Sequence, residues 1–309
     1  MYRLLKAAIP MGAGIALACA GSGFAQNNAA APAFSDEVSK QAGIYQSRGE
    51  KVPGGYVTDR SLLAYAAALP PGFRQTLADL GPKDRWLDIG AGRGQAVLDY
   101  YTPRYDAMHR EGQERRGKKA QSVAMSIEDR RNALWHQTAE KLEAEQIRYL
   151  SGRRLREYSA AELGKFALIT DVFGGFSYTQ YLSLFMEKVL AALEVNGSFY
   201  TTLIDVYPEN AANRPLKRDT PFLTEIVNAD GSRAGICAWL KSISCIAVSC
   251  ELKSEWEAPI EAYQVRKVCD KATVPALTIT HFAAGTPPER RFQAQQMLTG
   301  SPAPRNAAR

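Results

Sequence analysis

The sequence predicts an α/β protein whose sheet is mostly parallel and is covered by helices on both faces. Three observations predict this class: a buried strand over 85–89 runs into a glycine-rich turn, strand-like and helical segments then alternate up to residue 204, and two β-rich segments follow over 245–253 and 262–269. Strand–helix alternation implies parallel strands joined by crossovers, whereas adjacent β-rich runs separated by a turn indicate an antiparallel hairpin.

The first 25 residues resemble a secretory signal. Arg3 and Lys6 give a positive start, a mostly apolar stretch over 7–20 follows, and small residues offer cleavage after Ala20 or Ala25. We therefore expect a signal peptide over 1–25 and a periplasmic or secreted protein with no membrane span after cleavage. An uncleaved anchor and a wrongly chosen start codon are the alternatives.

Cysteine usage agrees with export. Without Cys19, which lies in the expected signal, the chain has four cysteines, Cys237, Cys245, Cys250 and Cys269. An even number within one region predicts two disulfides in an oxidising compartment, with three possible pairings, and four separate buried thiols are the alternative. There is no Cys-x-x-Cys pair and no cluster of histidines, so we expect no metal site.

The charge balance gives no sign of a nucleic-acid partner. The formal net charge of +6 becomes +4 when the two basic residues of the signal are removed. The basic runs at 115–119, 130–131 and 153–156 lie beside acidic residues and have no aromatic residues between them. Solvated surfaces account for such runs, so we expect no nucleic acid to bind.

Residues 26–69 are expected to form a flexible spacer followed by an N-terminal helical lid. The run over 61–69 predicts a helix that Pro70 and Pro71 end, and 73–80 predicts a second, shorter helix.

The glycine-rich turn is the most informative motif. Gly90, Gly92 and Gly94 allow positive φ angles and a close approach of a ligand to the backbone. Asp88 ends the preceding strand, at the edge of the sheet where α/β proteins hold ligands. Gln95 stands where a dinucleotide fingerprint needs its third glycine, and no Gly-Lys-Ser/Thr follows, so neither a dinucleotide site nor a P-loop is predicted.

The remaining elements continue the alternation. Apolar residues at helical spacing mark 182–193 as the clearest helix of the chain. We expect further helices over 95–109, 130–145 and 235–243, and further strands over 120–127, 146–150, 166–171 and 198–204.

These motifs together resemble one family. The pattern Asp-x-Gly-x-Gly-x-Gly over 88–94 resembles motif I of the class I S-adenosylmethionine-dependent methyltransferases. Residues 166–176 are similar to the motif IV of this family, and 193–199 to its motif V–VI, in the same order. The resemblance implies a Rossmann-like seven-stranded methyltransferase sheet, mostly parallel with an antiparallel hairpin at its end and helices on both faces. We place this domain at 70–284 and a flexible tail at 285–309.

The resemblance also implies S-adenosylmethionine as cofactor, with a small-molecule or unknown acceptor. In the family an acid after the second strand binds the ribose; Ser126 stands at that place and Glu128 two residues on, where it could instead start the next helix. Arg153 stands where the family usually has an acid that meets adenine. The cofactor-binding residues it implies are Asp88, Gly90, Ala91, Gly92, Gly94, Glu128 and Asp171.

Asp171 is also the candidate catalytic residue, because it ends the fourth strand near the place where a substrate nucleophile would wait. Its alternative role is to cap the following turn. Two functions stay open at this point. One is an exported methyltransferase, and the other is a methyltransferase-like binding or assembly module without catalysis.

Overall fold

A computed structural model describes residues 60–101, 119–204, 223–253, 260–283 and 288–298. The expected signal peptide and spacer lie outside the described residues. Within the described ranges, no helix is long and apolar enough to cross a membrane.

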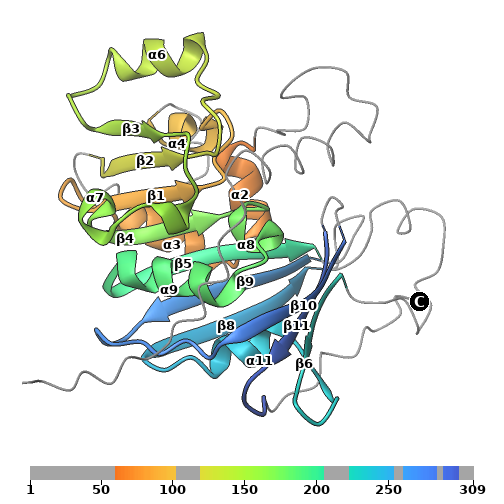
Figure 1. Ribbon diagram of the computed structural model, residues 1–309. Helices are drawn as coiled ribbons and strands as arrows, with labels where there is room; N and C mark the ends of the chain where they lie inside the picture. The colour runs from red at the N-terminus through yellow and green to blue at the C-terminus, as the bar shows by residue number, and fades with distance from the viewer. Residues whose placement is uncertain (1–59, 102–118, 205–222, 254–259, 284–287, 299–309) are drawn as a thin grey trace, which may run out of the picture.

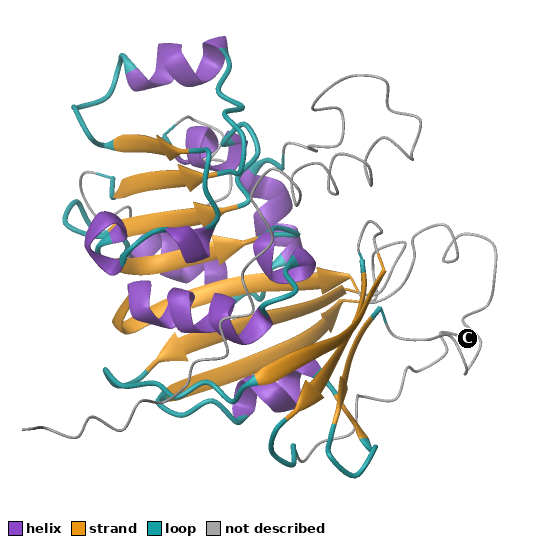
Figure 2. Ribbon diagram, viewed as in Figure 1, coloured by secondary structure: helices purple, strands orange, loops and turns teal. Residues whose placement is uncertain are grey.

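The described strands form two sheets (Figures 1 and 2). The first has seven strands in the order β3-β2-β1-β4-β5-β9-β8, and the second has four in the order β10-β11-β6-β7. The strands are β1 (Arg85–Ile89), β2 (Gln121–Met125), β3 (Ile147–Leu150), β4 (Phe166–Asp171), β5 (Leu193–Ile204), β6 (Thr224–Val227), β7 (Arg233–Ala234), β8 (Ile246–Lys253), β9 (Ile260–Lys267), β10 (Leu277–Ala283) and β11 (Glu289–Ala294).

The first sheet confirms the predicted fold class. Its strands β1 to β5 pair in parallel, and β9 pairs antiparallel with both β5 and β8. The described helices are α2 (Leu62–Ala68), α3 (Gly72–Asp79), α4 (Gln95–Tyr100), α6 (Ala133–Ala139), the 3-10 turn η1 (Leu155–Glu157), α7 (Ala160–Leu163), α8 (Gly175–Tyr178), α9 (Leu182–Ala192) and α11 (Ile236–Lys241).

Two predicted boundaries need correction. The helix expected over 130–145 is only α6, because Asn132 caps it and chain turns follow from residue 140. The strand expected over 198–204 begins earlier, at Leu193; inside it the register against β4 shifts and Asn196 has a φ of 69°. The end of the helix expected at residue 109 lies outside the described residues.

The two faces of the first sheet carry separate hydrophobic cores, because successive strand side chains point in opposite directions. Trp86 of β1 packs with α2, α3, α4 and α6 on one face. Its neighbour Leu87 belongs to the core on the other face, together with α8, α9 and α11. Helices therefore cover both faces, as predicted.

The second sheet was not predicted. The expectation of a flexible tail from residue 285 is wrong for 289–294, which form β11 between β10 and β6. Phe292 of β11 and Ile226 of β6 are fully buried in the same core as Leu87. The second sheet therefore shares a core with the first, and Figure 1 shows its strand β6 beside α11.

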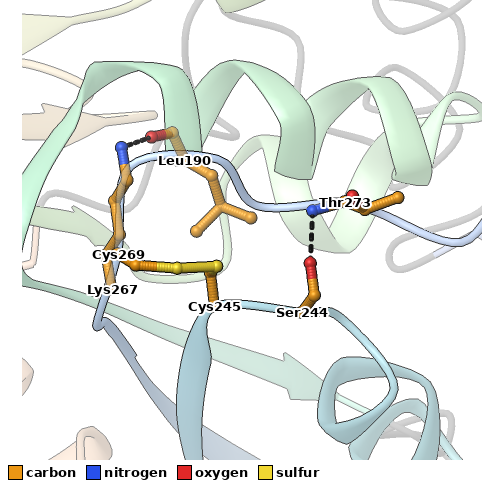
Figure 3. The surroundings of a disulfide bond; sticks show 6 residues. All are labelled: Leu190, Ser244, Cys245, Lys267, Cys269 and Thr273. Atoms are coloured by element: carbon orange, nitrogen blue, oxygen red, sulfur yellow. Dashed lines mark hydrogen bonds between the residues drawn. A yellow bond between two sulfur atoms is a disulfide. The ribbon is translucent and has the colours of Figure 1, made fainter.

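The cysteines of the described chain form two disulfides, as predicted. Cys237 of α11 pairs with Cys250 of β8, and Cys245 pairs with Cys269 across the β8–β9 hairpin. Figure 3 shows the second disulfide beside Lys267, whose ammonium donates to the carbonyl of Leu190 at 2.8 Å. These covalent links fix the far edge of the first sheet and fit an oxidising compartment.

Candidate functional site

The site predicted from the glycine turn lies at the point where the strand order of the first sheet reverses. The chain proceeds outward from β1 to β3 on one side and then returns to β4 on the other. Open α/β sheets bind ligands at the carboxyl ends of the strands beside such a reversal. The two loops touch at glycines: a Cβ on Gly90 would lie 2.8 Å from the Cα of Gly174.

The glycine turn has the backbone that its sequence predicts. Gly90, Gly92 and Gly94 have φ angles of 71°, 58° and 79°, a region that favours glycine. A Cβ on Gly94 would lie only 2.4 Å from the ring of Trp135, which α6 places against the turn. Tyr149 of β3 donates its hydroxyl to the carbonyl of Gly92 at 2.5 Å. Gly94 therefore serves close packing within the protein, whereas Gly90 is solvent-exposed.

Ala91, the other residue of the predicted loop, is held to the neighbouring strand. Its N–H donates to the carbonyl of Met125, the last residue of β2, at 2.9 Å. This bond continues the β1–β2 pairing past the end of β1 and fixes where the turn begins.

Asp88 is fully buried beneath this turn and is surrounded by hydroxyl donors. Thr170 of β4 donates to it at 2.7 Å, and the hydroxyl of Tyr65 lies 3.0 and 3.1 Å from its two carboxylate oxygens. Trp86 in turn donates its indole N–H to Thr170 at 2.8 Å. Burial raises the pKa of Asp88 to about 7, although the hydrogen bonds from Thr170 and Tyr65 oppose the rise.

Asp171 lies at the end of β4, as predicted, but its carboxylate faces the protein. It is fully buried and accepts hydrogen bonds from the backbone N–H groups of Gly174 at 3.0 Å and Phe176 at 3.1 Å. Burial raises its pKa to about 7 against these bonds, and the nearby charge of Asp88 adds to the rise. Asp171 thus caps the turn into α8, the alternative role, while its assignment as a catalytic or cofactor-contacting residue stays a prediction.

The order of the first sheet, with one antiparallel strand between β5 and the edge, decides the architecture. This is the class I methyltransferase fold. The glycine turn stands at its ligand edge, directly after β1.

No protein-family profile matches the sequence, and a search of curated proteins finds no match. Similar solved structures include an rRNA methylase from Streptococcus thermophilus, with 11% identity, a TM-score of 0.39, and 64% of this chain and 95% of that chain covered.

Two others were solved with a bound product. The 1,6-didemethyltoxoflavin-N1-methyltransferase of Burkholderia thailandensis, with bound S-adenosylhomocysteine, has 15% identity and a TM-score of 0.41 over 76% of this chain and 87% of that one. PKMT2 from Rickettsia typhi, in complex with AdoHcy, has 20% identity and a TM-score of 0.34 over 48% and 27%. The sheet order, rather than these likenesses, identifies the fold.

Two further positions of the methyltransferase fold bear side chains that are already paired. Glu128 follows β2 and forms an ion pair with Arg130 at 2.5 Å. Arg153 follows β3, donates to Glu162 at 2.8 Å and stacks 4.0 Å from the centre of the Tyr158 ring. A ligand ribose at Glu128 would therefore have to replace the Arg130 contact, and Arg153 points to protein groups.

Sequence reasoning missed the partners that α2 and α6 bring to the turn. The helix around Tyr65 was predicted as part of a lid, but nothing in the sequence indicates that its hydroxyl reaches Asp88. Nothing in the sequence around Trp135 indicates that its ring packs against Gly94. The sequence did offer one signal for the Tyr65–Asp88 contact. An acid in a buried strand needs a donor, and the predicted lid carries a tyrosine that could supply one.

Proposed function

We propose that this protein transfers a methyl group from S-adenosylmethionine to a small-molecule acceptor. One observation supports this most: after β1, which carries the buried Asp88, three glycines take left-handed φ angles at the strand-order reversal of a methyltransferase sheet. Gly90 is exposed, so a ligand could reach its backbone.

The residues present fit the amino-acid end of this cofactor best. When bound, S-adenosylmethionine supplies an electrophilic methyl group on its sulfonium. Asp88 is a buried acceptor for the amino group of the ligand, and the turn from Gly90 to Gly94 approaches it through backbone. Glu128 is the acceptor that could reach the ribose once its contact with Arg130 is exchanged.

The chain contributes by alignment rather than by a strong base. In-line methyl transfer depends on holding donor and acceptor atoms close and oriented, and on excluding water. A general base is required only where the acceptor loses its proton early. Burial of Asp171 in its capping role is therefore compatible with the proposed reaction.

A second candidate function is a binding or assembly module that keeps the fold without catalysis. The observation that favours it is that Asp88, Glu128 and Arg153 are each bonded to groups of the protein itself.

Calorimetry with the purified protein tests the first proposal. We expect S-adenosylhomocysteine and S-adenosylmethionine to bind at micromolar to millimolar concentration, and Gly92→Asp to abolish binding by placing a charged side chain on the turn. Gly231→Asp is the matched control, since Gly231 also has a positive φ, of 81°, but lies in an exposed turn of the second sheet. No heat with either ligand would rule out the methyltransferase proposal.

Transfer of labelled methyl groups separates the two functions when the cofactor binds. The protein would be incubated with methyl-labelled S-adenosylmethionine and a small-molecule extract of its source cells. We expect a labelled product with wild-type protein and none with Gly92→Asp. Binding without any transfer would favour the non-catalytic module.

We infer that the protein is exported through a cleaved signal over 1–25. The two disulfides support this location. Since S-adenosylmethionine is made inside cells, an exported enzyme needs cofactor to reach its compartment. Fractionation of a tagged full-length chain, followed by mass spectrometry of its N-terminus, checks the proposal: a cytosolic product that begins at Met1 would refute it.

A further inference from the structure

Helix α2 is fastened over the predicted ligand edge by the two acids that flank the glycine turn. The backbone N–H of Leu62, its first residue, donates to the carboxylate of Asp99 in α4 at 3.0 Å. One turn later, the hydroxyl of Tyr65 reaches both carboxylate oxygens of Asp88. The ring of Tyr65 is buried, so this contact closes the approach to Asp88 from the α2 side.

Among the groups that face Asp88, one hydrogen-bond donor could be replaced by a stronger one from a ligand. Thr170 of β4 takes one oxygen with a short bond, and the side chain of Asp171 adds a second negative charge nearby. Arg60, just before α2, is near enough to favour the charged form of Asp88, but it stacks on the Phe173 ring with its guanidinium 4.7 Å from the ring centre. Of these, the Tyr65 hydroxyl is the donor that a ligand could replace.

Chemistry makes this exchange favourable for an ammonium group. A neutral phenol donates a weaker hydrogen bond to a carboxylate than a charged ammonium does, by roughly a factor of two. Tyr65 carries a single hydroxyl proton, yet its oxygen is near both oxygens of Asp88, so it satisfies at most one of them at a time. An ammonium with three protons could satisfy both.

We propose that the Tyr65 hydroxyl is a placeholder for the amino group of the ligand, and that it must leave Asp88 before the ligand amino group binds there. The proposal rests on the proposed function, since it assumes a ligand with an amino-acid end. It assigns Tyr65 a gating role: the residue competes with the cofactor at Asp88 rather than contacting it.

The test compares Tyr65→Phe with Tyr200→Phe by calorimetry at pH 8, where the carboxyl of Asp88 is mostly ionised. The control is matched, because the hydroxyl of Tyr200 also joins a lid-side helix to the sheet, through Thr76 of α3 at 2.8 Å, but does not touch Asp88. Phenylalanine keeps the packing of either ring, and thermal unfolding verifies that both variants fold.

Two probes separate the amino group from the nucleoside. S-adenosylhomocysteine carries the amino acid, whereas 5′-methylthioadenosine has a methyl group in its place. We expect Tyr65→Phe to tighten S-adenosylhomocysteine about tenfold, the equivalent of about 1.4 kcal/mol, because a competing donor of ordinary hydrogen-bond strength is removed. Affinity for 5′-methylthioadenosine should change less than twofold, and Tyr200→Phe should leave both affinities unchanged.

Each other outcome overturns the proposal in a recognisable way. Equal or weaker binding of S-adenosylhomocysteine to Tyr65→Phe would mean that Tyr65 is indifferent or contacts the ligand, and the proposed function would stand. If Tyr65→Phe raised the affinity for both probes equally, or if both variants raised the affinity for S-adenosylhomocysteine, the cause would be a generally loosened lid. If neither wild type nor Tyr65→Phe binds S-adenosylhomocysteine, the proposed function fails together with this inference.

Discussion

The half of the molecule around the glycine turn and the half around the second sheet are stabilised in different ways. Around the turn, the contacts join elements that the strand–helix alternation already brings together, such as Trp135 of α6 against Gly94. In the C-terminal half, a buried arginine and two covalent links hold the elements together: Arg290 of β11 reaches α8, and disulfides tie α11 to β8 and join the residues just before β8 and just after β9. The first half shapes the candidate site, and the second half holds the loop on the far side of it.

Arg290→Met is the change with the largest expected effect on this comparison. The guanidinium is buried and donates to the carbonyls of Phe176 and Thr179, both at 2.9 Å, and to the hydroxyl of Thr224 at 3.0 Å. We expect a loss of about 4 kcal/mol in the free energy of unfolding, because buried acceptors lose their donor.

Chemical denaturation measures this loss. Arg291→Met is the control, since Arg291 is half-exposed and its buried partner Glu225 keeps an ion pair with Arg233 at 3.4 Å; we expect a smaller loss there, of about 2 kcal/mol. Equal losses for the two variants would show that the second sheet does not anchor α8 through Arg290.

Removal of the Cys237–Cys250 disulfide comes next. Replacing both residues by serine frees a link between positions 13 residues apart, and such loops give about 3 kcal/mol of stability. Affinity for S-adenosylhomocysteine should stay the same, because this disulfide lies at the edge strand β8, and β4, β5 and β9 separate β8 from β1 and its glycine turn. A loss of affinity together with the loss of stability would show that the C-terminal half also shapes the candidate site.

Gly94→Ala should cost about 2 kcal/mol more stability than Gly231→Ala. Both glycines have a φ near 80°, so both variants carry the same backbone strain. The added Cβ lies 2.4 Å from Trp135 at position 94 and meets nothing within 4 Å at position 231. The difference between the unfolding free energies of the two variants, measured by denaturation, gives the cost of the contact with Trp135. Equal losses of unfolding free energy would mean that Trp135 moves aside freely.

A dependence of stability on pH is expected as well. The pKa values of Asp88 and Asp171 are both raised from 3.8 to about 7 in the folded protein. Between pH 4 and 7 the folded chain retains protons that the unfolded chain has released, so stability falls as pH rises through this window.

Melting temperatures check this sign. We expect the melting temperature to be a few degrees lower at pH 8 than at pH 5.5, and the difference to shrink in Asp88→Asn. A melting temperature that rises over the same interval would contradict the raised pKa values.

The parallel part of the fold could be predicted from the sequence because its signals are local. The apolar strand over 85–89, the glycines after it and the helical stripe over 182–193 each identify their own element. The second sheet escaped prediction because β11 pairs in parallel with β6, about 65 residues away, and carries Arg290 in its buried face. A buried arginine is readable only when its distant acceptors are known.

In the candidate site, too, some features follow from local sequence and others depend on distant contacts. The conformation of Gly90 to Gly94 followed from residue types, since positive φ is the property for which glycine is used. The role of Asp171 did not, because an acid at the end of a strand has the same sequence signature whether it faces a ligand or caps a turn. The positions of the N–H groups of Gly174 and Phe176 establish the cap, and they are visible only in the folded chain.

The contact between Gly90 and Gly174 has a consequence for how relatives of this chain could be recognised. A Cβ at position 90 would collide with the backbone of Gly174, and one at position 174 would lie 2.8 Å from the carbonyl of Ile89. Neither glycine tolerates a side chain unless the loops move apart. Homologous sequences with the same site should therefore keep glycine at both positions together, about 84 residues apart, even where little else in the alignment agrees.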